Sequence, residues 1–186
     1  YHGLFEVLKL SSSNAGKTLA VTAAAGSVGS LVGQMAKNLG LKVVGVAGST
    51  EKCQWLTDTL GFDAALNYKN ADFAEQLASA TPEGIDFFFE NTGGAAQGPI
   101  FNRMNAHGRI AVCGLIAEYQ KEQPDPGPSW LNIIKKRLMI QGFTMPDHFH
   151  RIGEYSQALG GMLGKGELQY RAHVIEGIES ATTGIN

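Results

Sequence analysis

Val21-Thr-Ala-Ala-Ala-Gly-Ser-Val-Gly29 decides the fold of this chain, because a short apolar segment breaks there into glycines and an amphipathic segment follows. Its spacing matches the G-x-G-x-x-G fingerprint at Ala24, Gly26 and Gly29, with alanine in place of the first glycine. A strand, tight turn and helix in this order point the amide-rich, partially positive helix N-terminus at an anion. The stretch predicts a turn that binds a pyrophosphate, although glycines that serve only helix–sheet packing would look similar.

A helix and a second strand are predicted directly after this turn. Gly40 stands where a C-terminal cap glycine belongs, and the strand Lys42–Ala47 follows. We expect Gly26 to admit the phosphates, and Gly29 with Gly33 to bring the helix close to the sheet. Alanine at the first fingerprint position supports the turn if its φ stays negative. The predicted buried face, with i, i+3, i+4, i+7 spacing, consists of Val28, Leu31, Val32, Met35, Ala36 and Leu39.

Length and composition fit one domain. The 186 residues are 44% hydrophobic and 17% charged, enough to bury a core without disulfides. A formal net charge of −2 and a pI near 6.2 give no footprint for nucleic acid, and Lys135-Lys-Arg137 is interpreted as a solvated helix end. Cys53 and Cys113 are the only cysteines, which favours a reducing compartment, the cytoplasm. The sequence shows neither a membrane-spanning apolar run nor a secretory signal.

Strands and helices alternate along the chain. An opening helix is predicted over Leu4–Leu10, and Glu118–Pro128, with its prolines, is interpreted as a loop at the site. The strands are continuous apolar runs, as expected when helices cover both sheet faces. The predicted fold class is α/β, a single doubly wound parallel sheet of the Rossmann type, which binds ligands where the strand order reverses. The predicted strands are Thr18–Ala23, Lys42–Ala47, Ala64–Asn67, Ile85–Glu90, Arg109–Cys113, Leu138–Thr144 and a seventh candidate, Arg171–Ile175.

The end of the second predicted strand bears on the choice of cofactor. An NAD-preferring site would place Asp or Glu about 20 residues beyond the glycines, to bind the ribose 2′-hydroxyl. Gly48 and Ser49 stand there instead. Lys52 follows on the first turn of the next helix, where the helix dipole disfavours a cation unless an anion lies opposite. A ribose 2′-phosphate would be such an anion, whereas a solvated Lys52 offset by Glu51 is the alternative. By the same reasoning, Tyr68, after the third strand, would be an ordinary surface tyrosine.

Several segments together carry a family resemblance. They are Ala23-Ala-Ala-Gly-Ser-Val-Gly-Ser30, Val43-Val-Gly-Val-Ala-Gly-Ser-Thr-Glu-Lys52, Leu60-Gly-Phe-Asp63, Asn67-Tyr-Lys69, Asn91-Thr-Gly-Gly94, Cys113-Gly-Leu-Ile-Ala-Glu-Tyr119, Pro126-Gly-Pro128 and Tyr170-Arg-Ala-His-Val-Ile-Glu-Gly177. As a set they resemble the zinc-independent medium-chain reductases, and more narrowly the branch of leukotriene B4 12-hydroxydehydrogenase/prostaglandin reductase and the 2-alkenal (double-bond) reductases. The resemblance implies an NADPH-dependent enzyme that saturates the carbon–carbon double bond of α,β-unsaturated aldehydes and ketones.

The resemblance also implies roles for individual residues. The implied cofactor-binding residues are Ala24, Gly26, Ser27, Val28 and Gly29 at the pyrophosphate, Gly48, Ser49, Lys52 and Tyr68 at the 2′-phosphate end, and Asn91, Cys113 and Gly114 at the nicotinamide end. Tyr119 is the implied catalytic residue, which reaches the substrate carbonyl oxygen from a mobile loop. A loop aromatic that packs on the prolines is the alternative. Cys113 is interpreted as a small neutral residue rather than a nucleophile.

The implied reaction is hydride transfer from the nicotinamide C4 to the β-carbon of the enone, followed by protonation at the α-carbon. Tyr119 or a ribose hydroxyl of the cofactor would donate a hydrogen bond to the oxygen where charge develops. No metal is expected, because His148 and His150 would point in different directions on a helix. The chain departs from the family pattern at Glu90, where Asp is expected, and at Glu118, where an uncharged polar residue is expected. The second departure bears on substrate preference.

The chain resembles only the cofactor-binding part of these reductases. We expect residues 1–186 to form an NADP-binding domain, with residues 1–10 in the helix that joins two domains, and the GroES-like catalytic domain and closing C-terminal segment to lie outside this chain. Such a fragment should bind NADPH but show little activity on enones or alkenals alone. The family suggests a homodimer through an edge strand. Neither nucleic acid nor membrane is expected as a partner. Two alternatives remain open: a quinone or zinc-dependent alcohol oxidoreductase of the same superfamily, and a non-catalytic NADP-binding sensor or interaction module.

Overall fold

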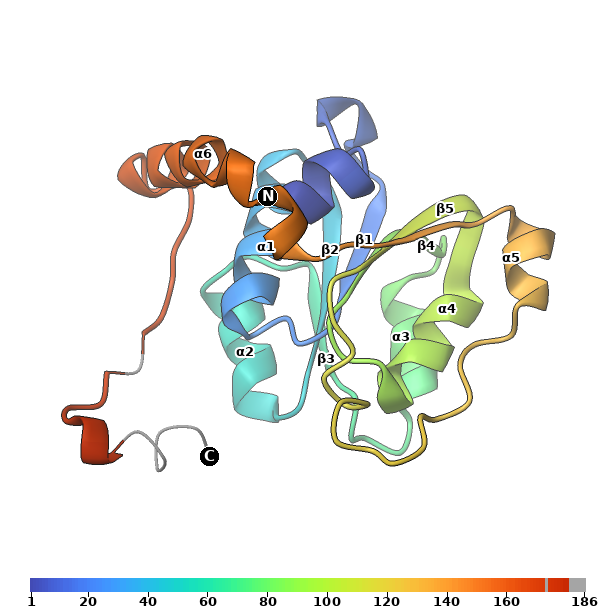
Figure 1. The fold of residues 1–186 in the computed structure, drawn as a ribbon. Coiled ribbons are helices and arrows are strands. Elements are labelled where there is room, and N and C mark those ends of the chain that lie inside the picture. Colours follow the sequence, from blue (N-terminus) through green and yellow to red (C-terminus); the bar gives the residue numbers. More distant parts are fainter. Residues whose placement is uncertain (173, 181–186) are drawn as a thin grey trace.

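The computed structural model describes residues 1–172 and 174–180, which form a six-stranded parallel sheet with helices on both faces (Figure 1). The strands are β1 (Thr18–Val21), β2 (Lys42–Ala47), β3 (Ala64–Asn67), β4 (Ile85–Glu90), β5 (Met104–Val112) and β6 (Met139–Gly142). Their order is β3-β2-β1-β4-β5-β6, and every pair is parallel. The order reverses between β1 and β4, so their carboxyl ends form the switch point. The predicted fold class is confirmed.

Helices lie in two layers. The helices are α1 (Ser27–Asn38), α2 (Thr50–Asp58), α3 (Phe73–Ala80), α4 (Gln97–Arg103), α5 (Leu131–Lys136) and α6 (Ile152–Gly164), with the π-helical turn η1 (Gly3–Val7) and the 3₁₀ turns η2 (Ser12–Asn14), η3 (Gly94–Ala96), η4 (Met145–Arg151) and η5 (Ile178–Ser180). The first face of the sheet is covered by α1, α2, η1 and α6, and the second by α3 and α4 (Figure 1). No described helix is both long and apolar enough to cross a bilayer.

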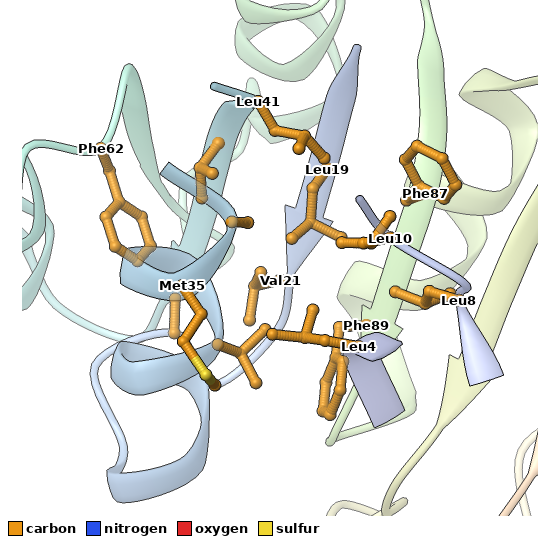
Figure 2. Close-up of a cluster of buried hydrophobic side chains, with 14 of the residues drawn as sticks. Leu4, Leu8, Leu10, Leu19, Val21, Met35, Leu41, Phe62, Phe87 and Phe89 are labelled. Atoms are coloured by element: carbon orange, nitrogen blue, oxygen red, sulfur yellow. The ribbon is translucent and has the colours of Figure 1, made fainter. Parts of the chain in front are cut away.

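The larger core lies on the first face, and Figure 2 shows its centre. Leu19 and Val21 of β1 point to this face together with Phe89 of β4, because alternate strand residues share a face. They meet Leu4 of η1 and Met35 of α1, all buried (Figure 2). Complete burial of each such side chain contributes about 1.5–3 kcal/mol. This core fixes α1, and with it the glycine turn, against the strand ends.

The intervening residues form the second core. Ala20 of β1 and Phe88 of β4 point to the opposite face, where they pack with Leu77 of α3 and Ile100 of α4. Residues two apart in a strand point to the same face, so Thr22 points to the same side as Ala20, and Glu90 to the same side as Phe88. The switch point is therefore anchored from both faces of the sheet.

Several predicted boundaries shift. β1 ends at Val21 because Ala23 takes a left-handed conformation, with φ +47°. β5 begins at Met104 rather than Arg109, since it pairs with the start of β4 across a register shift that sequence pattern does not reveal. β6 stops at Gly142, and the Phe143 ring packs edge-on against Phe89 instead. The opening helix is a π-helical turn over residues 3–7.

The seventh predicted strand is wrong for residues 171, 172, 174 and 175, which form no strand, and residue 173 lies outside the described residues. The segment before it runs beside α1 rather than along a sheet edge. The Gln169 N–H donates to Oε1 of Gln34 at 2.7 Å, and Asn38 donates to the Glu167 carbonyl at 3.1 Å. These side-chain contacts take the place of strand pairing.

Candidate functional site

The glycine turn at the end of β1 is built from backbone contacts. The Ala24 N–H donates to the Val46 carbonyl at 3.0 Å, and the Gly26 N–H donates to the Ala23 carbonyl at 2.9 Å. Ala23 carries the positive φ, and Ala24, at the first fingerprint position, does not. Ala24 therefore satisfies the condition set for an alanine there, and the left-handed residue falls one position earlier than the fingerprint suggests.

Two glycines of α1 are required by close approach. A Cβ on Gly29 would stand 2.8 Å from the Ala24 Cα and would run into the Ala23 carbonyl. A Cβ on Gly33 would overlap the ring of Phe62. The helix therefore meets the sheet with its smallest residues. For that reason the predicted buried face is wrong at its flank, where Val28 is 48% exposed.

The N-terminus of α1 opens onto two cavities. Gly26 is the N-cap residue and provides no side-chain cap, so the first N–H groups of α1 lack an intrahelical acceptor. One cavity, of about 350 Å³, lies over the ends of β1 and β2 and includes Gly26, Gly48 and Tyr68. The other, of about 530 Å³, lies between α1 and α2 and includes Ser27. Lys52 lines both cavities.

Two cations and a phenol gather around Gly48 at the end of β2. A Cβ on Gly48 would lie 3.3 Å from the Tyr68 ring and 3.7 Å from Cε of Lys69. Lys52 lies on the first turn of α2, as predicted, and Ser49 caps that helix by accepting from the Lys52 N–H at 3.3 Å. Within the described part of the chain, the Lys52 ammonium has no hydrogen bond or ion pair. Lys69 was missed by sequence reasoning, and its place beside Tyr68 was the only signal for it.

Three of the predicted residues meet at the ends of β4 and β5. The N–H groups of Cys113 and Gly114 donate to the Glu90 carbonyl at 2.9 and 3.2 Å. Asn91 follows Glu90, and its Nδ2 donates to the Thr22 carbonyl at 2.7 Å. The structure therefore brings Asn91, Cys113 and Gly114 together at the switch point. Burial raises the pKa of the Cys113 thiol, which keeps that thiol neutral near pH 7.

Tyr119 lies in the long connection between β5 and α5. Its hydroxyl oxygen accepts a hydrogen bond from the Leu115 N–H at 3.1 Å, next to Gly114, while the side chain is 68% exposed. Glu118 turns into its own loop, where Oε1 accepts from Lys121 at 3.0 Å and Oε2 accepts from the Asp125 N–H at 2.9 Å. The Asp125 N–H and Lys121 together lower the pKa of Glu118. Its carboxylate therefore serves the shape of the loop.

The two histidines considered as metal ligands lie in η4. His148 stacks on His2, with ring centroids 3.7 Å apart, and the His2 ring also forms a 3.0 Å hydrogen bond with the Tyr155 hydroxyl. Among residues 1–172 and 174–180, no group of three or more His, Cys, Asp or Glu side chains is placed to hold a metal ion.

The parallel sheet, the glycine turn at its switch point and the adjoining cavities define a Rossmann-type doubly wound domain. The chain belongs to the zinc-binding dehydrogenase family, whose sequence profile matches residues 27–161. The described residues do not provide a ligand set for the zinc in that description.

Known proteins similar to this chain are longer than it. It is 46% identical over 182 residues to prostaglandin reductase 1 of Bos taurus, which covers 95% of the chain and 54% of the relative. It is 41% identical over 186 residues to the 2-alkenal reductase (NADP(+)-dependent) of Nicotiana tabacum, covering 100% of the chain and 53% of the relative. CurA of Vibrio vulnificus, solved in complex with NADPH, superposes with a TM-score of 0.90 at 41% identity, covering 98% of this chain and 55% of CurA. The chain thus spans about half the length of these proteins.

Proposed function

We propose that this chain is the NADPH-binding domain of a reductase that saturates the carbon–carbon double bond of α,β-unsaturated aldehydes and ketones. One observation carries the proposal: Lys52 and Tyr68 gather around Gly48, beside the glycine turn, where an NAD-specific domain would place a carboxylate. The names of the relatives, NADP(+)-dependent 2-alkenal reductase among them, support the cofactor and the substrate class.

The chain's own residues fit the charged end of such a cofactor. Gly26 and Gly29 let the turn close tightly onto the start of α1, since a Cβ on Gly26 would lie 3.2 Å from the Ala23 carbonyl oxygen and one on Gly29 would run into it. The uncapped N–H groups of Ser27 and Val28 at the start of α1 would bind the pyrophosphate. Lys52 would donate to the 2′-phosphate, and the Tyr68 hydroxyl, which lines the same cavity, would support it. Lys69 adds a second positive charge at this end.

We propose that the nicotinamide end of the cofactor binds at the switch point between β1 and β4. Asn91, Cys113 and Gly114 lie beside the nicotinamide, which supplies a hydride to the β-carbon of the substrate. The Tyr119 hydroxyl uses its oxygen as an acceptor in the structure, so its proton remains free to donate. From that position it donates to the carbonyl oxygen of an enone or alkenal as negative charge develops there.

We propose that residues outside this chain complete the substrate site. The relatives are about twice as long as the chain, and the Tyr119 side chain is 68% exposed, which leaves it accessible to residues outside the chain. Residues 1–10, which contain the π-helical turn η1, then form part of the connection to that domain. Two free thiols, Cys53 and Cys113, favour a reducing compartment such as the cytoplasm.

A cofactor competition tests the proposal. Thermal unfolding of the 186-residue chain is measured with NADPH, with NADH and without ligand. At about 100 times its dissociation constant, NADPH should stabilise the chain by about 2.7 kcal/mol, or about 5–10 °C. NADH at the same concentration should give a much smaller shift. Lys52→Glu should abolish the difference, and Lys165→Glu, the same charge change on the far side, should preserve it. Equal shifts with both cofactors would contradict the proposal.

We also propose that β6 pairs with a second copy of the chain. All four of its residues are exposed, and an unpaired strand edge is a template for strand addition. Trp130 and Ile134, at the start of and within the preceding helix α5, are 82% and 76% exposed and add apolar surface for a partner. Analytical ultracentrifugation should show a dimer that Ile140→Lys converts to a monomer. A monomeric wild-type chain would contradict this assembly.

A further inference from the structure

Glu90, the last residue of β4, is a buried carboxylate that the proposed function leaves without a role. It is completely buried at the switch point. Its Oε1 accepts hydrogen bonds from the Thr22 hydroxyl at 2.5 Å and from the Thr92 N–H at 2.8 Å. The single proton of the Thr92 hydroxyl lies between Oε1, at 3.3 Å, and the Gly93 carbonyl oxygen, at 3.2 Å. Among the described residues, its Oε2 has no hydrogen-bond partner. A carboxyl group buried with one oxygen unpaired is costly, and the contacts of the other oxygen show which residues Glu90 holds.

These hydrogen bonds connect Glu90 to two residues that line a cavity, Thr22 and Thr92. Thr22 is the residue after β1, and Thr92 lies two residues after β4. Both line the cavity of about 350 Å³ that opens at the glycine turn. Glu90 itself lies behind them. It therefore acts on anything in the cavity through these two residues.

Thr22, which is held by Glu90, in turn holds Asn91 through hydrogen bonds. A hydroxyl has a single proton, and the Thr22 proton is given to Glu90, so its oxygen is left to accept from the Asn91 N–H at 2.8 Å. The side chain of Asn91 then donates through Nδ2 to the Thr22 carbonyl at 2.7 Å. With that amide end engaged, Oδ1 is the free acceptor of Asn91 within the described part of the chain.

We propose that Glu90 is a positioning residue for the nicotinamide end of the cofactor site, acting through Thr22 to hold Asn91. This inference rests on the proposed function. Glu90 fixes the direction of the Thr22 hydroxyl, and the hydroxyl and carbonyl of Thr22 together fix the main chain and amide of Asn91. The amide then presents Oδ1 as an acceptor for a donor group on the nicotinamide riboside. A charged acceptor holds such a chain more firmly than a neutral one.

The test compares a ligand that contains the nicotinamide with one that lacks it. Binding of NADPH and of adenosine 2′,5′-bisphosphate, which lacks the nicotinamide, is measured by calorimetry on the 186-residue chain. Circular dichroism in the nicotinamide absorption band reports the setting of the ring in bound NADPH. The variants are Thr22→Val, which keeps the shape and removes the hydroxyl, Thr22→Ser, which restores it, and Glu90→Gln, which keeps an acceptor and removes the charge. Glu75→Gln, on the exposed side of α3, is the matched control.

We expect Thr22→Val to weaken NADPH binding about tenfold, the effect of losing one hydrogen bond that matters for the cofactor, and Glu90→Gln to weaken it about threefold. Both should diminish the nicotinamide dichroism of the bound cofactor. Affinity for the bisphosphate should stay within about twofold in every variant, since the charged end is untouched. Thr22→Ser and Glu75→Gln should behave as wild type.

Two results would overturn the inference. Equal loss of affinity for both ligands would show that Glu90 and Thr22 only maintain the fold, and unchanged NADPH affinity and dichroism in Thr22→Val and Glu90→Gln would show that they do not act on the cofactor. A wild-type chain that binds neither ligand would instead refute the proposed function, and the inference with it. Retained bisphosphate binding distinguishes a folded variant from one that has lost its structure.

Discussion

The glycine turn follows the carboxyl end of β1 and the Tyr119 loop follows the carboxyl end of β5, but different contacts hold them in place. The turn is fixed by backbone on backbone: Gly29 approaches the Ala24 main chain so closely that a methyl group has no room. The loop is fixed by side-chain contacts near the surface, such as the ion pair between Lys121 and the partly buried Glu118. Surface ion pairs contribute little to stability, whereas close-packed backbone cannot yield. Under the proposed function, the rigid turn would hold the pyrophosphate and the less rigid loop would meet the substrate.

Gly29→Ala should have the largest effect. The added Cβ meets main-chain atoms of Ala23 and Ala24, so neither side can move aside, and we expect a loss of about 3 kcal/mol in the free energy of unfolding, at the upper end for overpacking. Urea denaturation measures it. Gly160→Ala, on the open side of α6, is the matched control and should stabilise the chain by about 0.5–1 kcal/mol. Equal changes in the free energy of unfolding for Gly29→Ala and Gly160→Ala would contradict the close packing of the turn.

Gly33→Ala should cost less, because its new Cβ meets a side chain rather than backbone. The Phe62 ring is buried but can adjust, so we expect a loss of about 1–2 kcal/mol, after the gain in helix propensity is counted. The double variant with Phe62→Leu should be more stable than the two single effects predict when added, by about 1 kcal/mol. Strict additivity in a double-mutant cycle would show that Phe62 is not the obstacle.

Tyr119→Phe probes the loop without touching the turn. It removes one hydrogen bond, to the Leu115 N–H, from a largely exposed side chain. We expect a loss of about 0.5 kcal/mol at most in the free energy of unfolding and no change in NADPH affinity. A calorimetric titration that showed weaker cofactor binding would mean that the loop and the turn are coupled.

The smallest effect is expected from acid. The Asp125 N–H, and after it Lys121, lower the pKa of Glu118 in the folded chain. The stabilisation that Glu118 gives the loop is therefore complete above the ordinary glutamate pKa of about 4.3 and is lost as the pH falls through the lower value of the folded state. The amide resonance of Asp125 should titrate in that range, while those of Gly26 and Gly29 stay still. In Glu118→Gln the Asp125 inflection should disappear. Parallel shifts at the glycines would contradict a rigid turn.

The sequence pattern was sufficient for the parts of the molecule that depend on local chemistry. Gly40 follows α1 with a φ of +82°, as its position as a cap glycine predicts. Lys52 lies on the first turn of α2, and Tyr68 follows β3, because strand ends and helix starts are marked by residues close in sequence. Their meeting around Gly48 follows from the parallel sheet alone.

The errors arose where distant residues decide the outcome. The buried stripe of α1 faces the sheet through Gly29 and Gly33, so Val28 lies outside it, which apolar spacing alone cannot reveal. The early start of β5 depends on its pairing with β4. Glu90 was recognised as a departure from the family pattern, but its hydrogen bond to Thr22 joins residues far apart in the chain.

The strand order also constrains how this chain can fold. Four of the five strand pairs join neighbours in the sequence, and only the β1–β4 pair spans two intervening strands. Closing it orders the chain between residues 22 and 86, an entropic cost that local pairs do not carry. The β1–β4 pair therefore carries the largest loop-closure cost of the five strand pairs. The switch point exists only where this pair has formed, because Thr22 after β1 meets Glu90 and Asn91 at the end of β4 there.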